Sequence, residues 1–236
     1  MKKVGKLIFK LTILLLCAAI IIGLIFLRKG YKLYQQQIME RPLTEVVNEI
    51  MRKDDFVPYE QISEDFCDAV VAIEDHRFWF RDGIDYIAIG RALVVNIATG
   101  SVSEGGSTIT QQLAKNLYFS NQPSLVRKIA EIFFVHDLES MYTKEEILSL
   151  YVNIIYYGDG YYGIKQAANG YYDKEPSELD LYESAMLAGL PQAPSIYQLS
   201  TGLEKAQKRQ KQVLDAMVLY EFITQQDMDA ALAAHN

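Results

Sequence analysis

An apolar run near the start of the chain constrains the fold more than any other feature. Leu11 to Leu27 spans 17 residues, of which only Thr12 and Gly23 are not clearly apolar. As a helix, the run is roughly 25 Å long, close to the hydrocarbon thickness of a membrane. The sequence therefore predicts a transmembrane helix over residues 11–28, preceded by a lysine-rich stretch, residues 1–10, on the cytoplasmic side.

A cleaved signal peptide is the alternative interpretation of the same run. Cleavage needs small residues at the end of the apolar segment, whereas this run ends Ile25-Phe26-Leu27-Arg28. An uncleaved signal anchor is therefore favoured. Cations flank the run on both sides, so the positive-inside bias toward a cytoplasmic N-terminus and an extracytoplasmic remainder is modest.

Charge is divided unevenly along the chain. Residues 1–32 hold seven lysines and arginines and no acid; since the whole chain carries −7, residues 33–236 carry −14. A domain this acidic is a poor nucleic-acid binder, and it would repel anionic lipid unless its cations are clustered. The two cysteines, Cys17 and Cys67, lie in different settings, so neither a disulfide framework nor a structural zinc site is expected.

Beyond the anchor, residues 29–60 are expected to form a stalk with one short helix after Pro42, and residues 61–236 a single domain. Helical periodicity extends through most of this domain, and no alternating strand pattern occurs, which predicts an all-α fold class. Predicted N-terminal caps are Ser63, Thr143, Ser177 and Thr224. Further helices are expected from Pro123 to Met141 and over residues 202–221.

Four short segments carry polar residues in a fixed order along the chain. They are Glu74–Phe78 with Gly83, Gly105–Gln112 with Lys115 and Asn116, Arg127–Glu131, and Lys144–Asn153. Taken alone, each has a structural interpretation: acids at a helix end, a helix N-cap, an intrahelical ion pair and a capped amphipathic helix. The combination is far more specific than any single segment.

In order and spacing, these segments resemble the motifs of the peptidoglycan glycosyltransferase family, which includes monofunctional transglycosylases and the N-terminal domain of class A penicillin-binding proteins. The family patterns are E-D-x-x-F-x-x-H-x-G, G-G-S-T-I-T-Q-Q, R-K-x-x-E and K-x-x-I-L-x-x-Y-x-N, and the second is matched at every position. The resemblance covers about residues 60–230 and the anchor. Arg81 departs from the pattern, because it stands where the family has histidine.

The resemblance implies a lysozyme-like helical domain that polymerises lipid II into β-1,4-linked glycan strands, with inversion and release of polyprenyl pyrophosphate. A sugar hydroxyl is a weak nucleophile and needs a carboxylate base, a role that the resemblance gives to Glu74. The departing pyrophosphate needs positive charge, for which Lys115, Arg127 and Lys128 are candidates. Glu131, a second catalytic candidate, is expected to orient these cations or to share a divalent ion, Mg or Mn, although the sequence requires no cofactor.

Further substrate-binding candidates come from the same motifs. They are Asp75, Phe78, Ser107, Thr108, Gln111, Gln112 and Asn153. Inversion needs one displacement, so no covalent nucleophile is expected. No serine-x-x-lysine motif follows, so the penicillin-reactive domain of bifunctional relatives is expected to be absent. Expected partners are lipid II, the growing glycan strand, membrane lipid and other proteins of wall synthesis or division.

Several alternatives stay open. Residues 84–99 are too apolar for an ordinary surface helix, and they form either a core helix or an interfacial helix that dips into lipid. A membrane-bound lytic glycosidase would also use a glutamate, but it has no need for Lys115, Arg127 and Lys128. A non-enzymatic scaffold is the third hypothesis, and Arg81 in place of histidine is the feature in its favour.

Overall fold

The computed structural model describes residues 2–81, 83, 107–119 and 124–235. Throughout this part the chain is helical, and the described strand content is one isolated bridge between Tyr156 and Tyr162. The predicted all-α class is therefore confirmed. The helices are α1 (Lys2–Glu40), α2 (Leu43–Met51), α3 (Glu64–Glu74), α5 (Ile109–Tyr118), α6 (Leu125–Met141), α7 (Lys144–Ile154), α8 (Ile164–Tyr172), α9 (Leu181–Gly189), α10 (Pro194–Tyr197), α11 (Leu199–Leu219) and α12 (Gln225–Ala234), with short 3-10 turns at Tyr59–Gln61, Phe78–Phe80, Pro176–Glu178 and Leu190–Gln192.

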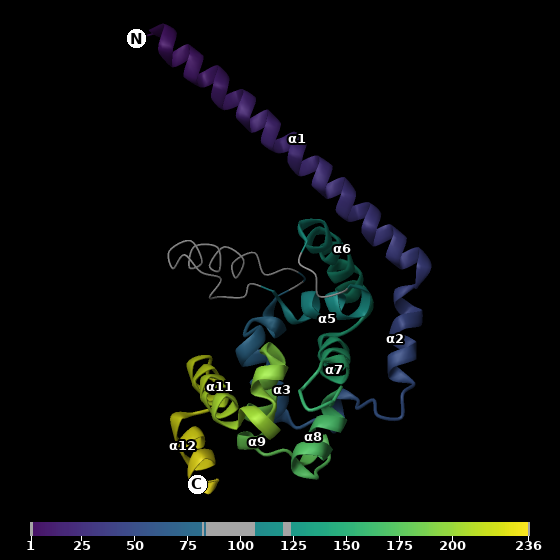
Figure 1. Ribbon diagram of the computed structural model, residues 1–236, viewed down its shortest axis with the longest axis vertical. Coiled ribbons are helices and arrows are strands. Elements are labelled where there is room, and N and C mark those ends of the chain that lie inside the picture. The colour runs from purple at the N-terminus through teal and green to yellow at the C-terminus, as the bar shows by residue number, and fades with distance from the viewer. Residues whose placement is uncertain (1, 82, 84–106, 120–123, 236) are drawn as a thin grey trace.

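The first helix, α1, is continuous over 39 residues and extends well beyond the other helices (Figure 1). Its portion from Phe9 to Glu40 contains a window apolar enough to cross a membrane, with a mean hydropathy of 2.7, and none of that window is buried by the rest of the protein. Leucines and isoleucines in this part face outward, which is costly in water and favourable in lipid. The structure thus has one N-terminal apolar helix consistent with a membrane anchor or a signal sequence.

The second half of α1 packs against α6 instead of starting a free stalk. The closest approach is at Gly30, where a Cβ atom would lie 2.4 Å from Ile129 Cγ2. Four residues later, the hydroxyl of Tyr34 hydrogen-bonds the carboxylate of Asp137. Burial and this acceptor raise the pKa of Tyr34 above its usual range, so the phenol stays protonated and continues to donate. Close packing and a hydrogen bond therefore fix the crossing of the two helices.

The short helix α2 also belongs to the folded body. Its apolar positions Leu43, Val46, Val47 and Ile50 are buried in the main hydrophobic core, and α2 packs against α7. The predicted short helix after Pro42 is confirmed, but the expected stalk over residues 29–60 is replaced by a packed segment. The reason is that an amphipathic helix buries its apolar stripe when a matching surface is available.

Of the four predicted helix caps, two are confirmed and two are corrected. Thr143 and Thr224 form capping boxes at α7 and α12. Ser63 precedes α3 without capping it, because its hydroxyl donates to a backbone carbonyl elsewhere in the domain. Ser177 lies in a 3-10 turn, and α9 begins later with Asp180 as its cap.

The centre of the domain determines where Glu74 lies. Helix α3 packs against α9 and α11, while α5 packs against α6 and α7. Because Glu74 ends α3, its carboxylate can meet side chains from both α5 and α11. The predicted apolar segment over residues 84–99, the glycine pair at 105–106 and Pro123 lie outside the described residues.

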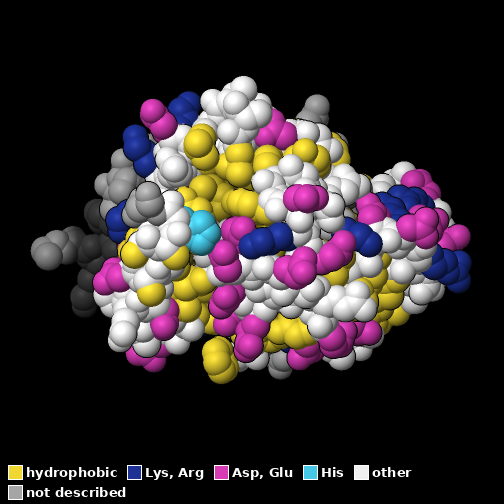
Figure 2. Space-filling view, turned by 90° about the horizontal axis from the view of Figure 1, so that it is seen from below, with side chains coloured by type: hydrophobic (Ala, Val, Ile, Leu, Met, Phe, Trp, Pro, Cys, Tyr) yellow, Lys and Arg dark blue, Asp and Glu magenta, His cyan; other side chains and the backbone are white. Residues whose placement is uncertain are grey.

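The face at the C-terminal end of the molecule is rich in acidic side chains. Figure 2 shows carboxylates spread across this face among hydrophobic side chains. Asp65, Asp180 and Asp227 border a hollow of about 530 Å³ there, between α3, α9 and α12. Each of these acids lies in the first turn of a helix or at its cap, where the helix dipole stabilises negative charge.

Candidate active site

The carboxylate of Glu74 is held by two neighbouring helices. Gln112 Nε2 in α5 donates to Glu74 Oε2 at 2.6 Å, and Arg209 Nη2 in α11 lies 4.0 Å from Oε1. The Glu74 side chain is 17% exposed, so it is shielded from bulk solvent but not sealed. An oriented carboxylate with one accessible edge is able to take a proton from a bound hydroxyl.

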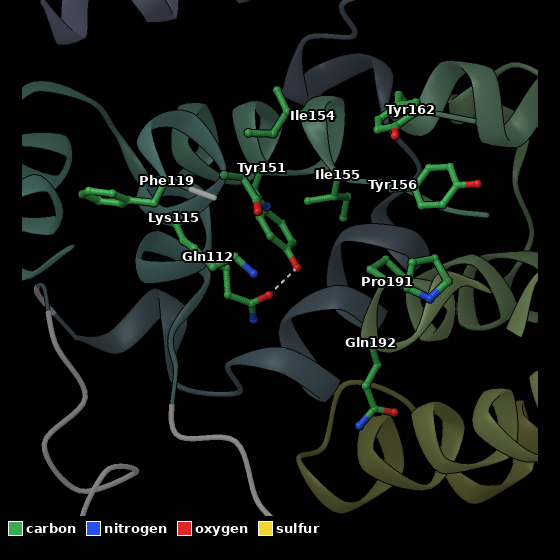
Figure 3. Close-up of a pocket in the computed structure, with 12 residues that line it drawn as sticks. Gln112, Lys115, Phe119, Tyr151, Ile154, Ile155, Tyr156, Tyr162, Pro191 and Gln192 are labelled. Carbon is green, nitrogen blue, oxygen red and sulfur yellow. Dashed lines mark hydrogen bonds between the residues drawn. The ribbon is translucent and has the colours of Figure 1, made fainter. Parts of the chain in front are cut away.

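Tyr151 fixes the orientation of Gln112. Its hydroxyl donates to Gln112 Oε1 at 3.1 Å (Figure 3). Because the amide oxygen of Gln112 accepts this bond, its amide nitrogen is the group that donates to Glu74. Burial, reinforced by the charge of Glu74, raises the pKa of Tyr151 well above its usual value, so the phenol remains a donor. The chain of hydrogen bonds Tyr151–Gln112–Glu74 joins α7, α5 and α3.

Arg209 approaches Glu74 from α11 and is nearly buried, at 8% exposure. Gly189 makes room for it, because a Cβ at that position would lie 2.9 Å from Arg209 Cγ. Burial lowers the pKa of Arg209 and the charge of Glu74 opposes this, but a guanidinium remains charged in proteins. The family resemblance extends past Arg209, but the motifs did not assign this residue to the site; tertiary packing brings it to Glu74.

A second group of charges lies on α6. Glu131 is completely buried, with Oε1 3.0 Å from Arg127 Nε and Oε2 2.9 Å from Lys128 Nζ. Lys128 Nζ also donates to Ser107 Oγ at 2.8 Å. In this geometry the buried carboxylate of Glu131 pairs with two cations, as expected of a residue that orients them. Its catalytic role stays a prediction from the sequence.

Lys115 links the two charge groups. Burial lowers its pKa, Glu131 and Glu74 act to raise it, and Arg127 and Lys128 act to lower it. The Lys115 ammonium is therefore within electrostatic reach of both the buried carboxylate and Glu74. Three cations around the one buried carboxylate leave an excess positive charge, which suits a pyrophosphate group.

A cavity of about 540 Å³ lies beside these residues. In Figure 3, Lys115 and Phe119 lie on one side of it, and Tyr156, Tyr162 and Pro191 lie on the other. The rings of Tyr156 and Tyr162 are 4.7 Å apart at their centroids. Aromatic surfaces interspersed with a few polar groups are typical of a site for an amphipathic ligand such as a sugar.

A second hollow, of about 360 Å³, opens between α3 and α11. Glu74, His76, Gln212 and Tyr220 are among the residues that line it, and the rings of His76 and Tyr220 stack at 3.9 Å. Glu74 lines this hollow directly, while Gln112, its hydrogen-bond partner, lines the first cavity. The carboxylate therefore lines one hollow and is one hydrogen bond away from a residue that lines the other.

Five expected substrate contacts are instead internal to the protein. Phe78 is fully buried, with Lys144 Nζ 4.8 Å from its ring centroid. Thr108 and Gln111 form the capping box of α5, and both are buried. A motif match identifies residue types, but it does not tell which side chains face a cavity.

Asn153 and Asp75 complete this group. Asn153 Nδ2 donates to Val57 O at 2.8 Å, and its Oδ1 accepts from Val57 N at 2.9 Å, so the amide binds a loop of the same chain. Asp75 is 7% exposed and accepts from the Ile109 backbone amide at 3.1 Å. Both side chains support the site from within.

The residues around Glu131 do not fit a divalent cation. Both of its carboxylate oxygens are ion-paired, with Arg127 and Lys128, so a metal would have to displace them and face their charges. Within the described ranges, the one grouping of three metal-ligating side chains is Asp180, Glu183 and His235. There the ammonium of Lys174 already contacts both Glu183 oxygens.

Tyr156 and Tyr162 are site residues that the sequence did not assign. They flank a tight turn in which Gly158 and Gly160 have positive φ angles of 90° and 89°. At Gly158 a side chain would also meet Pro194 O and Gln198 Cβ. The sequence feature that could have identified these two site residues is a pair of tyrosines on either side of closely spaced glycines.

Comparison with known proteins identifies the family of the chain. The sequence profile of the transglycosylase family matches residues 40–218. A provisionally named transglycosylase of Cupriavidus necator is 41% identical over 191 residues, which cover 81% of this chain and 82% of that protein. Penicillin-binding protein 1A of Vibrio cholerae is 43% identical over 174 residues, or 74% of this chain and 21% of that protein.

Penicillin-binding protein 1A of Neisseria gonorrhoeae is 42% identical over 181 residues, or 77% of this chain and 23% of that protein. The chain thus spans between a fifth and a quarter of the length of these relatives. The crystal structure of penicillin-binding protein 1A from Haemophilus influenzae aligns with a TM-score of 0.45 and 24% identity, over 75% of this chain and 17% of that one. Since the family profile spans most of the sequence and a relative matches along most of its own length, the chain belongs to the transglycosylase family and is a peptidoglycan glycosyltransferase.

Proposed function

We propose that this protein polymerises lipid II by inverting transfer, with Glu74 as the general base. The observation that carries the proposal is the position of Glu74. Its carboxylate lines one cavity and is hydrogen-bonded to Gln112, which lines the other, and it lies within electrostatic reach of the cation Lys115. One cavity would hold the acceptor sugar and the other the donor sugar. A single carboxylate between them would then act as the base when the new glycosidic bond forms.

The reaction uses these groups in one displacement. Glu74 takes the proton of the acceptor 4-hydroxyl as its oxygen attacks C1 of the donor sugar. The bond from C1 to the pyrophosphate oxygen breaks, and the negative charge leaves with polyprenyl pyrophosphate. Lys115, Arg127 and Lys128 stabilise that charge, while Gln112 keeps the base oriented.

The alternative functions explain less of the site. A lytic glycosidase would use a protonated glutamate and water, and the cations on α5 and α6 would have no role. A scaffold would not require Glu74 to be oriented by Gln112 and Tyr151. Recruitment of other wall-synthesis or division proteins stays a prediction from the sequence.

The membrane arrangement follows from the substrate. We propose that the first part of α1 is a single-pass anchor with a cytoplasmic N-terminus, so that the domain meets lipid II on the outer face. Anchoring would keep the site near the headgroups, because the lipid tail of the substrate lies in the same bilayer. The predicted membrane contact of residues 84–99 remains an expectation from the sequence.

Purified full-length protein with lipid II in detergent tests the proposal. We expect long glycan strands from wild type and from the control Glu145→Gln, which alters an exposed carboxylate on α7. Glu74→Gln should reduce the rate at least about 100-fold, since general bases contribute factors of this size, with an unchanged unfolding midpoint. Absence of polymer from folded wild type under varied detergent and divalent ions would reject the proposal, and an active Glu74→Gln would reject the base.

A further inference from the structure

Arg81 connects two buried carboxylates that come from different parts of the chain. Its Nε lies 3.3 Å from Asp75 Oδ1, its Nη2 pairs with Asp75 Oδ2, and its Nη1 lies 3.8 Å from Glu139 Oε1. Nη1 also donates to the backbone oxygen of Gly83. The Arg81 side chain is only 11% exposed. This guanidinium is therefore a nearly enclosed link between the turn after α3 and the C-terminal part of α6.

The same two carboxylates hold the first turn of α5. Asp75 Oδ2 accepts from the backbone amide of Ile109 at 3.1 Å, and Glu139 Oε1 accepts from Thr110 Oγ1 at 2.7 Å. Unpaired amides at a helix start need an acceptor, and an acid there also complements the dipole. The start of α5 is thus anchored by two acids that Arg81 brings together.

Helix α5 carries two residues of the active site. Gln112 hydrogen-bonds Glu74, and Lys115 supplies one of the three cations. Both lie within two turns of Ile109, so a shift at the start of the helix is transmitted to them directly. The position of α5 therefore controls both the orientation of the base and the place of a leaving-group cation.

Electrostatics explains why a cation is needed at this point. Two carboxylates that are each less than 10% exposed are costly unless they are paired. Lys144 pairs with Glu139 from α7, and Arg81 pairs with Asp75. Without the guanidinium, the buried Asp75 carboxylate would lose its charge partner, and nothing would hold it in place against the Ile109 amide.

We propose that Arg81 is a positioning residue, which fixes the start of α5 through Asp75 and Glu139 and so aligns Gln112 and Lys115 with the reaction. Its kinetic consequence rests on the proposed polymerase function. Arg81, which departs from the family pattern, thereby supports the site. The family pattern has a histidine at this position, and a histidine also carries a positive charge when it is protonated.

Three variants of the full chain test this role. Arg81→Gln removes the charge and keeps a hydrogen-bonding side chain, Arg81→His restores the family residue, and Arg41→Gln is the control, since Arg41 forms an exposed pair with Glu49. We expect Arg81→Gln to lower kcat at least 10-fold with a smaller change in KM, and Arg41→Gln to match wild type. Wild-type kcat in Arg81→Gln would overturn the proposal.

The pH profile separates positioning by charge from a packing role. An imidazole titrates near pH 6.5 in water, and Asp75, Glu139 and the nearby Lys144 set its value in Arg81→His. We expect Arg81→His to be active at acidic pH and to lose kcat as pH rises through this titration. The kcat profile of wild type should lack this decline at the imidazole titration, because arginine stays charged. A profile of Arg81→His that superimposes on that of wild type would overturn the proposal.

Hydrogen exchange tests the network independently of polymerisation. Amides of residues 109–112 should exchange faster in Arg81→Gln than in wild type, whereas those of α9 should be unchanged. Equal exchange in both proteins would overturn the positioning role. If wild type made no polymer, the proposed function would fail, but the exchange comparison would still decide whether Arg81 holds α5.

Discussion

Lys115 experiences opposing influences that make its charge sensitive to pH. Burial lowers its pKa, and the neighbouring carboxylates only partly compensate. A lysine with a lowered pKa is charged at neutral pH and loses its proton at a less alkaline pH than a lysine in water. Stabilisation of the leaving pyrophosphate by this cation should therefore decline as pH rises.

We expect the alkaline limb of the kcat/KM profile to depend on Lys115. Lys115→Arg should move this limb to higher pH, because a guanidinium does not titrate in this range, and Lys115→Ala should lower kcat/KM at least 10-fold at neutral pH. Rates of glycan synthesis between pH 6 and 10 provide the measurement. An identical limb in wild type and Lys115→Arg would show that another group titrates.

Individual site residues were only partly predictable from the sequence. The motifs pointed to Glu74, Lys115 and Arg127, and the packing of α3, α5 and α6 brings Lys115 within electrostatic reach of the other two. Phe78 is buried and Asn153 binds Val57, since the direction of each side chain depends on how the turn after α3 and the loop at Val57 fold back. These loops have no periodic signal, so no pattern in the sequence could place them.

At the scale of elements, the crossing of α1 and α6 couples the proposed anchor to the cation-bearing helix. Gly30 allows this crossing, because a side chain there would lie 2.4 Å from Ile129 Cγ2 and 3.2 Å from Val126 O. Ile129 directly follows the cations Arg127 and Lys128 in sequence. Any separation of the two helices therefore moves the leaving-group site.

We expect Gly30→Leu to separate these helices and to lower polymerisation about 10-fold or more. Overpacking of this kind costs roughly 1–3 kcal/mol, so a modest fall in the unfolding midpoint should accompany the loss. Gly23→Leu is the matched control, because nothing lies within 4 Å of a Cβ at Gly23. Equal activity of the two variants would argue against coupling through α1.

The segment that was expected to be a stalk shows that a hydrophobic pattern predicts a helix but not what the helix packs against. Leu43, Val46, Val47 and Ile50 follow helical spacing, so an amphipathic helix was recognisable. The pattern does not reveal which surface covers its apolar face, and here that surface is α7 with the main core. Helix type could thus be predicted, whereas its partner depended on the whole fold.

At the scale of the whole molecule, charge is arranged along the long axis. The site cations belong to α5 and α6, which lie nearer to α1, while the C-terminal face is rich in acids (Figures 1 and 2). The net charge of −14 beyond residue 32 is therefore compatible with a substrate in an anionic membrane. Composition alone could not show this separation.

Two nested truncations distinguish tethering from folding. Removing residues 1–27 should leave the α1–α6 contacts intact, so we expect an unchanged unfolding midpoint, near-normal rates in detergent and at least 10-fold slower synthesis on vesicles, because tethering raises the effective concentration. Removing residues 1–42 should lower the midpoint as well. Equal midpoints for the two truncations would contradict a structural role for the second half of α1.

The unbroken course of α1 has a mechanical consequence. From Lys2 to Glu40 it is one helix, about 58 Å long, and its far end is clamped to the catalytic body. In the proposed membrane arrangement no joint would separate lipid from enzyme, so the tilt of the helix would also be the tilt of the catalytic body. A transmembrane helix tilts further from the bilayer normal in a thin bilayer than in a thick one. Bilayer thickness would therefore change the angle at which the site meets its substrate.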